Sequence, residues 1–366
     1  MILNNHYLCA KVERTAKNLG MQDGIKSPQK GNSNKKKEKM KLRLYDENIG
    51  EILMERSYPD TYYTNEGDIQ ECITQLVPPY GDGFYHEICF ENVHISFGNI
   101  SLTNKLQLYF ESDFDTVEMH FALKGKSRAT SANFQEIVQF DSYQHNIIYA
   151  HHMQGKMEFY GPDLHILEIN LAPAFFKKFL PEDSGLFETF RNAIEKQHSS
   201  LINPDHNRIS LEMYQILNDL INCDRKGIFK RIYLEAKVSE LLLLQLEQLF
   251  NTSSSTSSLP KKDEEKIYAV RDYIANNLDA TCSLNELAHQ VGTNEFTLKK
   301  GFKELFGTTV FGFWNDTKME LAKKLLLDSD LNISEISDRI GYKNPRHFSA
   351  AFKRKYHILP SQVGSR

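Results

Sequence analysis

The sequence predicts an α+β protein of several domains, with a β-rich N-terminal part and an all-α C-terminal part. Hydrophobic residues mostly alternate with polar ones up to residue 172 and recur at helical spacing after it. A run rich in Ser and Thr at 251–260 then separates two helical regions and is typical of a flexible linker. With 366 residues, 40% of them hydrophobic, the chain is long enough for two or three packed domains.

The first 39 residues are polar, include a basic run at 35–39 and show no sustained periodicity. We expect a disordered N-terminal arm, with a phosphate-binding arm as the alternative.

Residues 40–172 are expected to form a sensor domain built as a small antiparallel sandwich or barrel, because short alternating segments are separated by turn residues such as Gly81-Asp82-Gly83. In the segment 116–124, one side is predicted to carry Val117, Met119, Phe121 and Leu123. In the segment 164–171, one side is predicted to carry His165, Leu167, Ile169 and Leu171.

Residues 173–250 are expected to form a helical extension, with helices at 174–180, 185–195, 209–222 and 228–250. Because Leu241 to Leu244 are apolar all round, the last helix is expected to be buried on more than one side. It can pack on its own sensor domain, form a dimer interface, or do both. We expect a homodimer, formed through the sensor or through this helix.

The five cysteines are odd in number and widely scattered, which favours reduced thiols. No apolar run approaches the roughly 20 residues that span a bilayer. Neither does the N-terminus have the regions of a secretory signal, so a cytoplasmic protein without membrane contact is expected. The cysteines are Cys9, Cys72, Cys89, Cys223 and Cys282.

The histidines of the β-rich part raise the question of a metal, but no H-x-H with a following Glu and His is present. His151 and His152 are neighbours, which in a strand would point to opposite sides. We therefore expect no metal, no cofactor and no catalytic residue, and not an enzyme. The histidines are His86, His94, His120, His145, His151, His152 and His165.

Two stretches of the C-terminal part, 261–366, repeat each other. Ser283 to Gly292 matches Asn332 to Gly341 at an offset of 49, and each copy has a capping residue followed three positions later by Glu. Each copy ends at a Gly suited to a left-handed turn. A second helix then begins at Asn294 or Asn344. The repeat predicts two helix-turn-helix units.

The second helix of each unit is predicted to bury one apolar stripe and expose a basic face. Net charge supports this region as the polyanion-binding part, since 261–366 has 17 Lys and Arg against 14 Asp and Glu, whereas the rest has 27 against 34. The buried stripes are Leu298, Phe302 and Leu305 in the first unit and Phe348, Phe352 and Tyr356 in the second.

These residues resemble the DNA-binding domain of the AraC/XylS family. The resemblance rests on Ser283-Leu-x-Glu286-Leu-Ala, Phe302-Lys-x-x-Phe-Gly307, Lys318-Met-x-x-Ala322, Ile333-x-Glu335-Ile, Gly341-Tyr342 and Phe352-Lys-Arg-x-Tyr356 followed by Pro360-Ser361. The segments 299–302 and 306–311 are similar to a siderophore-responsive subgroup. The chain departs from the family at His357, Lys318 and near Val363, and Gly301 inside a helix costs about 1 kcal/mol relative to Ala.

The resemblance implies a transcription regulator, such as an activator, that binds double-stranded DNA and contacts RNA polymerase, with a cupin-like sensor for a small effector. An iron-siderophore leads as effector, with a sugar or aromatic metabolite close behind. A cupin-type metalloenzyme fused to a DNA-binding module and a ligand-independent regulator stay open. The implied DNA-binding residues are Phe296, Thr297, Lys299, Lys300 and Lys303, and Arg346, His347, Ser349, Ala350, Lys353, Arg354 and Lys355.

Overall fold

The computed structural model describes residues 40–46, 52–58, 69–76, 81–134, 137–180, 185–250, 259–280 and 282–363. The predicted arm at 1–39 and most of the predicted linker lie outside these ranges. Two compact units make up the chain: Met1–Ile209 with Ile216–Phe250, and Ser210–Gln215 with Asn251–Arg366. We call them the N-terminal unit and the C-terminal unit.

The N-terminal unit contains one sheet with twelve described strands, and all its strand pairs are antiparallel. The strands are β1 (Met40–Asp46), β2 (Ile52–Tyr58), β3 (Gln70–Leu76), β4 (Gly81–Phe90), β5 (Val93–Leu102), β6 (Leu106–Ser112), β7 (Asp115–Ser131), β8 (Val138–Phe140), β9 (Gln144–His151), β10 (Gln154–Leu171), β11 (Ser200–Leu201) and β12 (Asn207–Arg208).

The two longest strands hold this sheet together. The main strand order is β11-β9-β7-β10-β5-β4-β3, and β10 also pairs with β6, which in turn pairs with β1. Strand β10 therefore joins the main path to the β6-β1-β2 segment. The register of β7 against β10 shifts around His165, as expected where a bulge bends a long strand.

The predicted alternation in β7 is present, but both of its faces are buried. Val117, Met119 and Phe121 are fully buried on one face, and His120 and Ala122 are nearly as buried on the other. An antiparallel sheet commonly exposes one face to water. Burial of both faces indicates that the second face lines an interior space.

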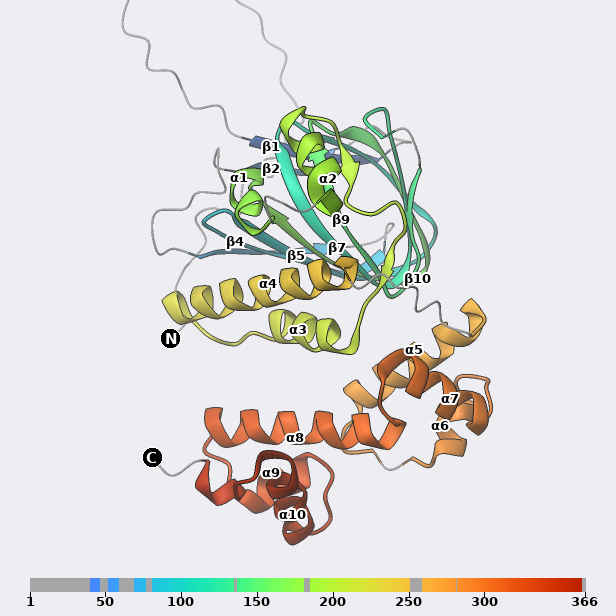
Figure 1. The fold of residues 1–366 in the computed structure, drawn as a ribbon, viewed down its shortest axis with the longest axis vertical. Helices are drawn as coiled ribbons and strands as arrows, with labels where there is room; N and C mark the ends of the chain where they lie inside the picture. Colours follow the sequence, from blue (N-terminus) through green and yellow to red (C-terminus); the bar gives the residue numbers. More distant parts are fainter. Residues whose placement is uncertain are drawn as a thin grey trace, which may run out of the picture. The chain divides into compact units, whose positions relative to one another are not determined.

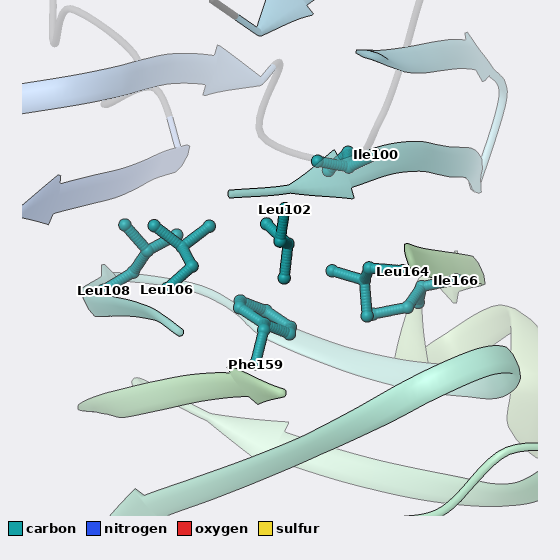
Figure 2. Close-up of a cluster of buried hydrophobic side chains, with 7 residues drawn as sticks. All are labelled: Ile100, Leu102, Leu106, Leu108, Phe159, Leu164 and Ile166. Atoms are coloured by element: carbon teal, nitrogen blue, oxygen red, sulfur yellow. The ribbon is translucent and has the colours of Figure 1, made fainter. Parts of the chain in front are cut away.

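Part of that interior is an apolar cluster contributed by strands far apart in sequence. The side chains of β5, β6 and β10 converge on one another (Figure 2). Burial of such side chains stabilises the fold by about 1.5–3 kcal/mol each. The members are Ile100, Leu102, Leu106, Leu108, Phe159, Leu164 and Ile166.

Helices follow the sheet at nearly the predicted positions: α1 (Pro173–Phe176) with a 3-10 turn (Lys177–Phe179), α2 (Gly185–Glu195), α3 (Leu211–Ile221) and α4 (Gly227–Phe250). Helix α4 lies along the sheet (Figure 1), where Lys230 pairs with Glu71 at 2.8 Å. Leu241 and Leu242 are buried, whereas Leu243 is 54% exposed. The last helix was expected to be buried on more than one side, and at Leu243 this expectation was wrong.

The C-terminal unit is helical. Its helices are α5 (Lys261–Asn276), α6 (Leu284–Gln290), α7 (Glu295–Phe306), α8 (Val310–Asp328), α9 (Ile333–Arg339) and α10 (Pro345–Tyr356), followed by a 3-10 turn (Pro360–Gln362). No helix within the described ranges is long and apolar enough to cross a membrane. A β-rich N-terminal region and a helical C-terminal region were thus predicted correctly.

Candidate nucleic-acid interface and interior cavity

The first helix pair, α6 and α7, is fixed by the capping residues that the repeat predicted. The backbone N–H of Glu286 donates to Ser283 Oγ at 3.2 Å, and the N–H of Ser283 donates to Glu286 Oε2 at 2.7 Å. Such a capping box satisfies N–H groups that have no partner inside the helix. Gly292 has φ +68° in the turn, and Asn294 then caps α7.

The second pair, α9 and α10, repeats this construction. Asn332 and Glu335 form the same reciprocal box, and Gly341 turns the chain with φ +76°. Asn344 caps α10, and Pro345 occupies its first position, where a missing N–H costs nothing. The caps and Gly turns predicted from the repeat are therefore confirmed.

Helix α8 contacts both pairs, because it touches α7 on one side of the unit and α9 and α10 on the other. Four members of the predicted stripes, Leu298, Phe302, Phe348 and Phe352, are inaccessible, and the last member of each stripe, Leu305 and Tyr356, is half-buried. Gly301 also has a packing reason. A Cβ there would lie 2.9 Å from Ile267 Cγ1 and 2.8 Å from Leu259 Cδ1, so glycine allows α5 and α7 to pack closely.

Most of the candidate DNA-binding side chains on α7 are exposed. Phe296 is 76% exposed, an unusual position for a large aromatic ring without a partner surface. Lys299 forms an ion pair with Glu295, and Lys303 donates to the carbonyl of Gly307 at the helix end. Lys300 is exposed, and Thr297 is half-buried.

Helix α10 presents a more basic surface than α7. Arg346, His347, Ala350, Lys353 and Arg354 are exposed, and Ser349 is half-buried. The helix contains no acidic residue.

Lys355 differs from the other basic residues of α10. Its Nζ lies 3.0 Å from Asp316 Oδ1 and 3.2 Å from Glu320 Oε1, both on α8. The structure thus gives Lys355 a contact between two helices, in addition to its predicted role at DNA.

His357 keeps the geometry of the glycine that the family has at this place. Its φ is +62°, close to the +67° of Gly307 at the end of α7, and both residues cap their helix by an N–H bond four residues back. Histidine is among the few side chains enriched in this region. The departure at His357 therefore leaves the end of α10 intact.

The N-terminal unit encloses a cavity of about 450 Å³. Most of its walls are apolar and include members of the cluster in Figure 2, such as Leu106, Phe159 and Ile166. A mainly apolar cavity with a few polar groups is the usual form of a small-molecule site. Its polar lining residues include Tyr85, His94, Glu118, His120, Arg128 and Glu168.

Glu118, His120 and Glu168 form a compact cluster on this lining. His120 Nδ1 lies 2.8 Å from Glu118 Oε1 and 3.6 Å from Glu168 Oε1. Burial by itself would lower the pKa of His120, but the hydrogen bond with Glu118 and the two carboxylates raise it. Burial and the Glu118 charge raise the pKa of Glu168. The sequence prediction did not bring these residues together.

A second group, Asp115, His151 and His152, corrects the prediction for the adjacent histidines. His151 Nδ1 lies 2.6 Å from Asp115 Oδ1, and His152 Nε2 lies 3.8 Å from the same oxygen. Strand β9 ends at His151, and His152 has φ +42°. The turn brings the second ring back beside the first, with 4.5 Å between the ring centroids, so the two histidines do not point to opposite sides.

Comparison with known protein families matches both units. The family described as the regulatory protein PchR N-terminal domain matches residues 91–261, and the helix-turn-helix domain family matches residues 287–366. Regulatory protein PchR of Pseudomonas aeruginosa is 32% identical over 123 residues, which are 33% of this chain and 42% of PchR. Together these matches support an AraC/XylS-family regulator.

Other relatives match shorter portions. The xylose operon regulatory protein of Escherichia coli is 32% identical over 90 residues, 25% of this chain and 23% of that protein. The chain thus spans less than half the length of these relatives. The C-terminal domain of AraT, a response regulator from Geobacillus stearothermophilus, is 28% identical, covers 30% of this chain and 87% of that structure, and has a TM-score of 0.27.

The cluster of Glu118, His120 and Glu168 in the cavity was not predicted from the sequence. Its signal was present as Glu118-x-His120 inside β7 and as Glu168 inside β10, two strands that are otherwise mainly apolar. Charged residues at alternate positions of such strands indicate a polar interior face.

Proposed function

We propose that the chain is a sequence-specific DNA-binding transcription regulator whose α6–α7 and α9–α10 pairs act as two helix-turn-helix units. The observation that carries this proposal is the repeated pair itself, capped in the same way twice, with an exposed and largely basic second helix in each copy. In such units the second helix enters the major groove. Two units would then read successive grooves about 34 Å apart.

The exposed and half-buried candidate side chains divide into two kinds of contact. Those near the start of each second helix are suited to base edges: Phe296, Thr297, Lys299 and Lys300 on α7, and Arg346, His347, Ser349 and Ala350 on α10. Those in the last turns are suited to phosphates: Lys303 on α7, and Lys353, Arg354 and Lys355 on α10. Ala350 offers only a methyl contact with thymine.

Arg346 is the candidate for bidentate readout of guanine, since its guanidinium is exposed at the start of α10. We expect Arg346→Ala to weaken binding to the selected site by about 1–3 kcal/mol, or 5- to 150-fold, and to relax the preference at one base pair. The measurement is selection of random duplex DNA by the full chain, followed by binding titrations at several salt concentrations.

Lys324→Ala is the matched control, because it also removes one exposed positive charge but from α8. It should leave the selected sequence unchanged. Selection of two half-sites about ten base pairs apart supports the two-unit proposal. Weak binding without sequence enrichment, equally reduced in both variants, contradicts it.

Control by a small effector is the second part of the proposal. The cavity supports it, and the candidate effectors are an iron-siderophore or another metabolite, such as a sugar or an aromatic compound. The β-rich unit then acts as a cupin-like sensor, and the protein regulates RNA polymerase in the cytoplasm rather than acting as an enzyme. Thermal stabilisation by the effector tests this part, and its absence favours a ligand-independent regulator.

We also propose the division into an arm (1–39), a sensor (40–172), a helical extension (173–250), a linker (251–260) and a DNA-binding domain (261–366). Homodimer formation through α4 is supported by three large apolar side chains exposed near its start, Ile228, Phe229 and Ile232. Sedimentation of Phe229→Asp beside the unmodified chain tests it, since a charge at this position should shift the chain to monomer.

A further inference from the structure

The geometry of the sheet places three potential metal ligands together. Glu118 and His120 are two residues apart on β7, so both point to the same face. Glu168 lies directly opposite His120 in the register of β10 against β7. Directly opposite residues have Cβ atoms about 5 Å apart, so the three side chains meet without any change in the backbone.

The distances fit one ion held by all three residues. One ligand atom from each lies within 4.8 Å of the others, and His120 Nδ1 is 2.8 and 3.6 Å from the two carboxylate oxygens. Metal–ligand bonds of about 2.1 Å separate neighbouring ligand atoms by about 3–3.4 Å. Small rotations of the side chains therefore suffice to coordinate an ion.

Outer contacts fix Glu168 in this arrangement. Its Oε2 accepts hydrogen bonds from Tyr85 OH and Ser96 Oγ, both at 3.2 Å, which leaves Oε1 directed to His120. Hydrogen bonds of this kind to one ligand oxygen orient carboxylates in metal sites.

His120 also differs from a histidine with a purely structural role. Both ring nitrogens of His145, on the neighbouring strand β9, contact glutamine side chains, at 2.7 and 2.8 Å. His120 is 5% exposed, and its Nε2 has no hydrogen-bond partner within the described part of the chain. The carboxylates lie at Nδ1 and not at Nε2, so the ring can turn to hold an ion through Nδ1 without breaking another side-chain hydrogen bond.

We infer that Glu118, His120 and Glu168 bind a divalent first-row transition-metal ion inside the cavity of the N-terminal unit. One imidazole and two carboxylates suit Mn²⁺, Fe²⁺, Co²⁺ or Zn²⁺, and the imidazole disfavours Mg²⁺ and Ca²⁺. The cavity supplies room for water at the remaining coordination positions.

The test is titration of the chelator-stripped full chain with Co²⁺, followed by visible absorption, and with Zn²⁺ or Mn²⁺, followed by calorimetry. We expect the unmodified chain to bind one metal ion per chain. In the double variant Glu118→Gln/His120→Gln this binding should be absent or at least about 100-fold weaker, since loss of an outer partner alone costs 10–100-fold in metal affinity. The single, nearly isosteric Glu168→Gln should weaken it as well, which protects the test if the double variant misfolds.

Two controls separate this site from other sites. His145→Gln removes a buried histidine that contacts α4 and should keep the bound ion. Asp115→Asn removes the shared carboxylate of the His151 and His152 group and should also keep it. Three results would overturn the inference. They are equal metal affinity of the Glu168→Gln variant and the unmodified chain, loss of the bound ion in Asp115→Asn, and no tightly bound ion in the unmodified chain.

A role for the ion as an effector rests on the proposed function, whereas metal binding itself does not. DNA affinity measured with and without Zn²⁺ addresses this role, with a change of at least fivefold expected. Because titration uses no DNA and selection uses no added metal, failure of the metal site and failure of the DNA-binding proposal give different results.

Discussion

The two units place their polar residues in opposite ways. The N-terminal unit buries many polar and charged side chains, including Glu87, His94, His120, His145 and Lys230. The C-terminal unit buries fewer polar side chains, among them Glu264, Arg271 and Ser337. Ile336, Phe348 and Phe352 pack on α8 in an apolar cluster, and most lysines and arginines of this unit are on the surface. A few polar groups inside a mainly apolar interior suit a small ligand, whereas a polar exterior suits a large, charged partner.

The largest effect expected from this difference is on pH dependence. His145 is fully buried, and burial, with a smaller contribution from His206, lowers its pKa to about 4. The unfolded chain, with a pKa of about 6.5, binds the proton more tightly. Stability from neutral His145 is therefore complete above pH 6.5 and is lost as the pH falls towards 4.

The difference in unfolding free energy between the unmodified chain and His145→Gln should accordingly fall by about 2 kcal/mol between pH 7.5 and 5. Urea unfolding followed by the β-sheet circular dichroism signal measures it. Trp314, the one tryptophan, is buried in the C-terminal unit, and its fluorescence transition should not distinguish the two proteins. A pH-independent difference would mean that His145 is not held neutral.

A second prediction concerns close packing in the C-terminal unit. Gly301→Val adds a branched side chain where Ile267 and Leu259 leave no room, and should destabilise this unit by about 1–3 kcal/mol in the Trp314 transition. Gly301→Ala is the graded control, since its gain in helix propensity offsets part of the crowding. Equal stability of the Val variant and the unmodified chain would contradict close packing of α5 and α7.

The smallest expected effect lies at the two helix ends. His357→Gly should stabilise the C-terminal unit by about 0.5–1 kcal/mol, because it relieves a left-handed backbone that costs a side chain about 1–2 kcal/mol. Gly307→Ala makes the opposite change at the matching end of α7 and should destabilise by a similar amount. Guanidinium midpoints from Trp314 fluorescence measure both, and changes of the same sign would refute the structural equivalence of the two ends.

The sequence predicted the helices better than the cavity for a physical reason. Caps such as Ser283 with Glu286 and turns such as Gly292 are local, so their spacing alone specifies α6 and α7. Glu168 lies 48 residues beyond His120, and only strand pairing brings them together. Exposure of Leu243 and the turn at His152 also depend on packing and backbone that periodicity does not encode.

Strand β7 suggests how such a protein can acquire a new specificity. Its inward positions, such as Glu118 and His120, line the cavity, whereas the alternating Val117, Met119 and Phe121 pack on the other face, where Phe121 stacks on His145 beneath α4. Every second residue can therefore be randomised without altering the surface that supports the helices. A combinatorial library at the inward positions would change which ligand the cavity binds. The packing of β7 beneath α4 would stay intact.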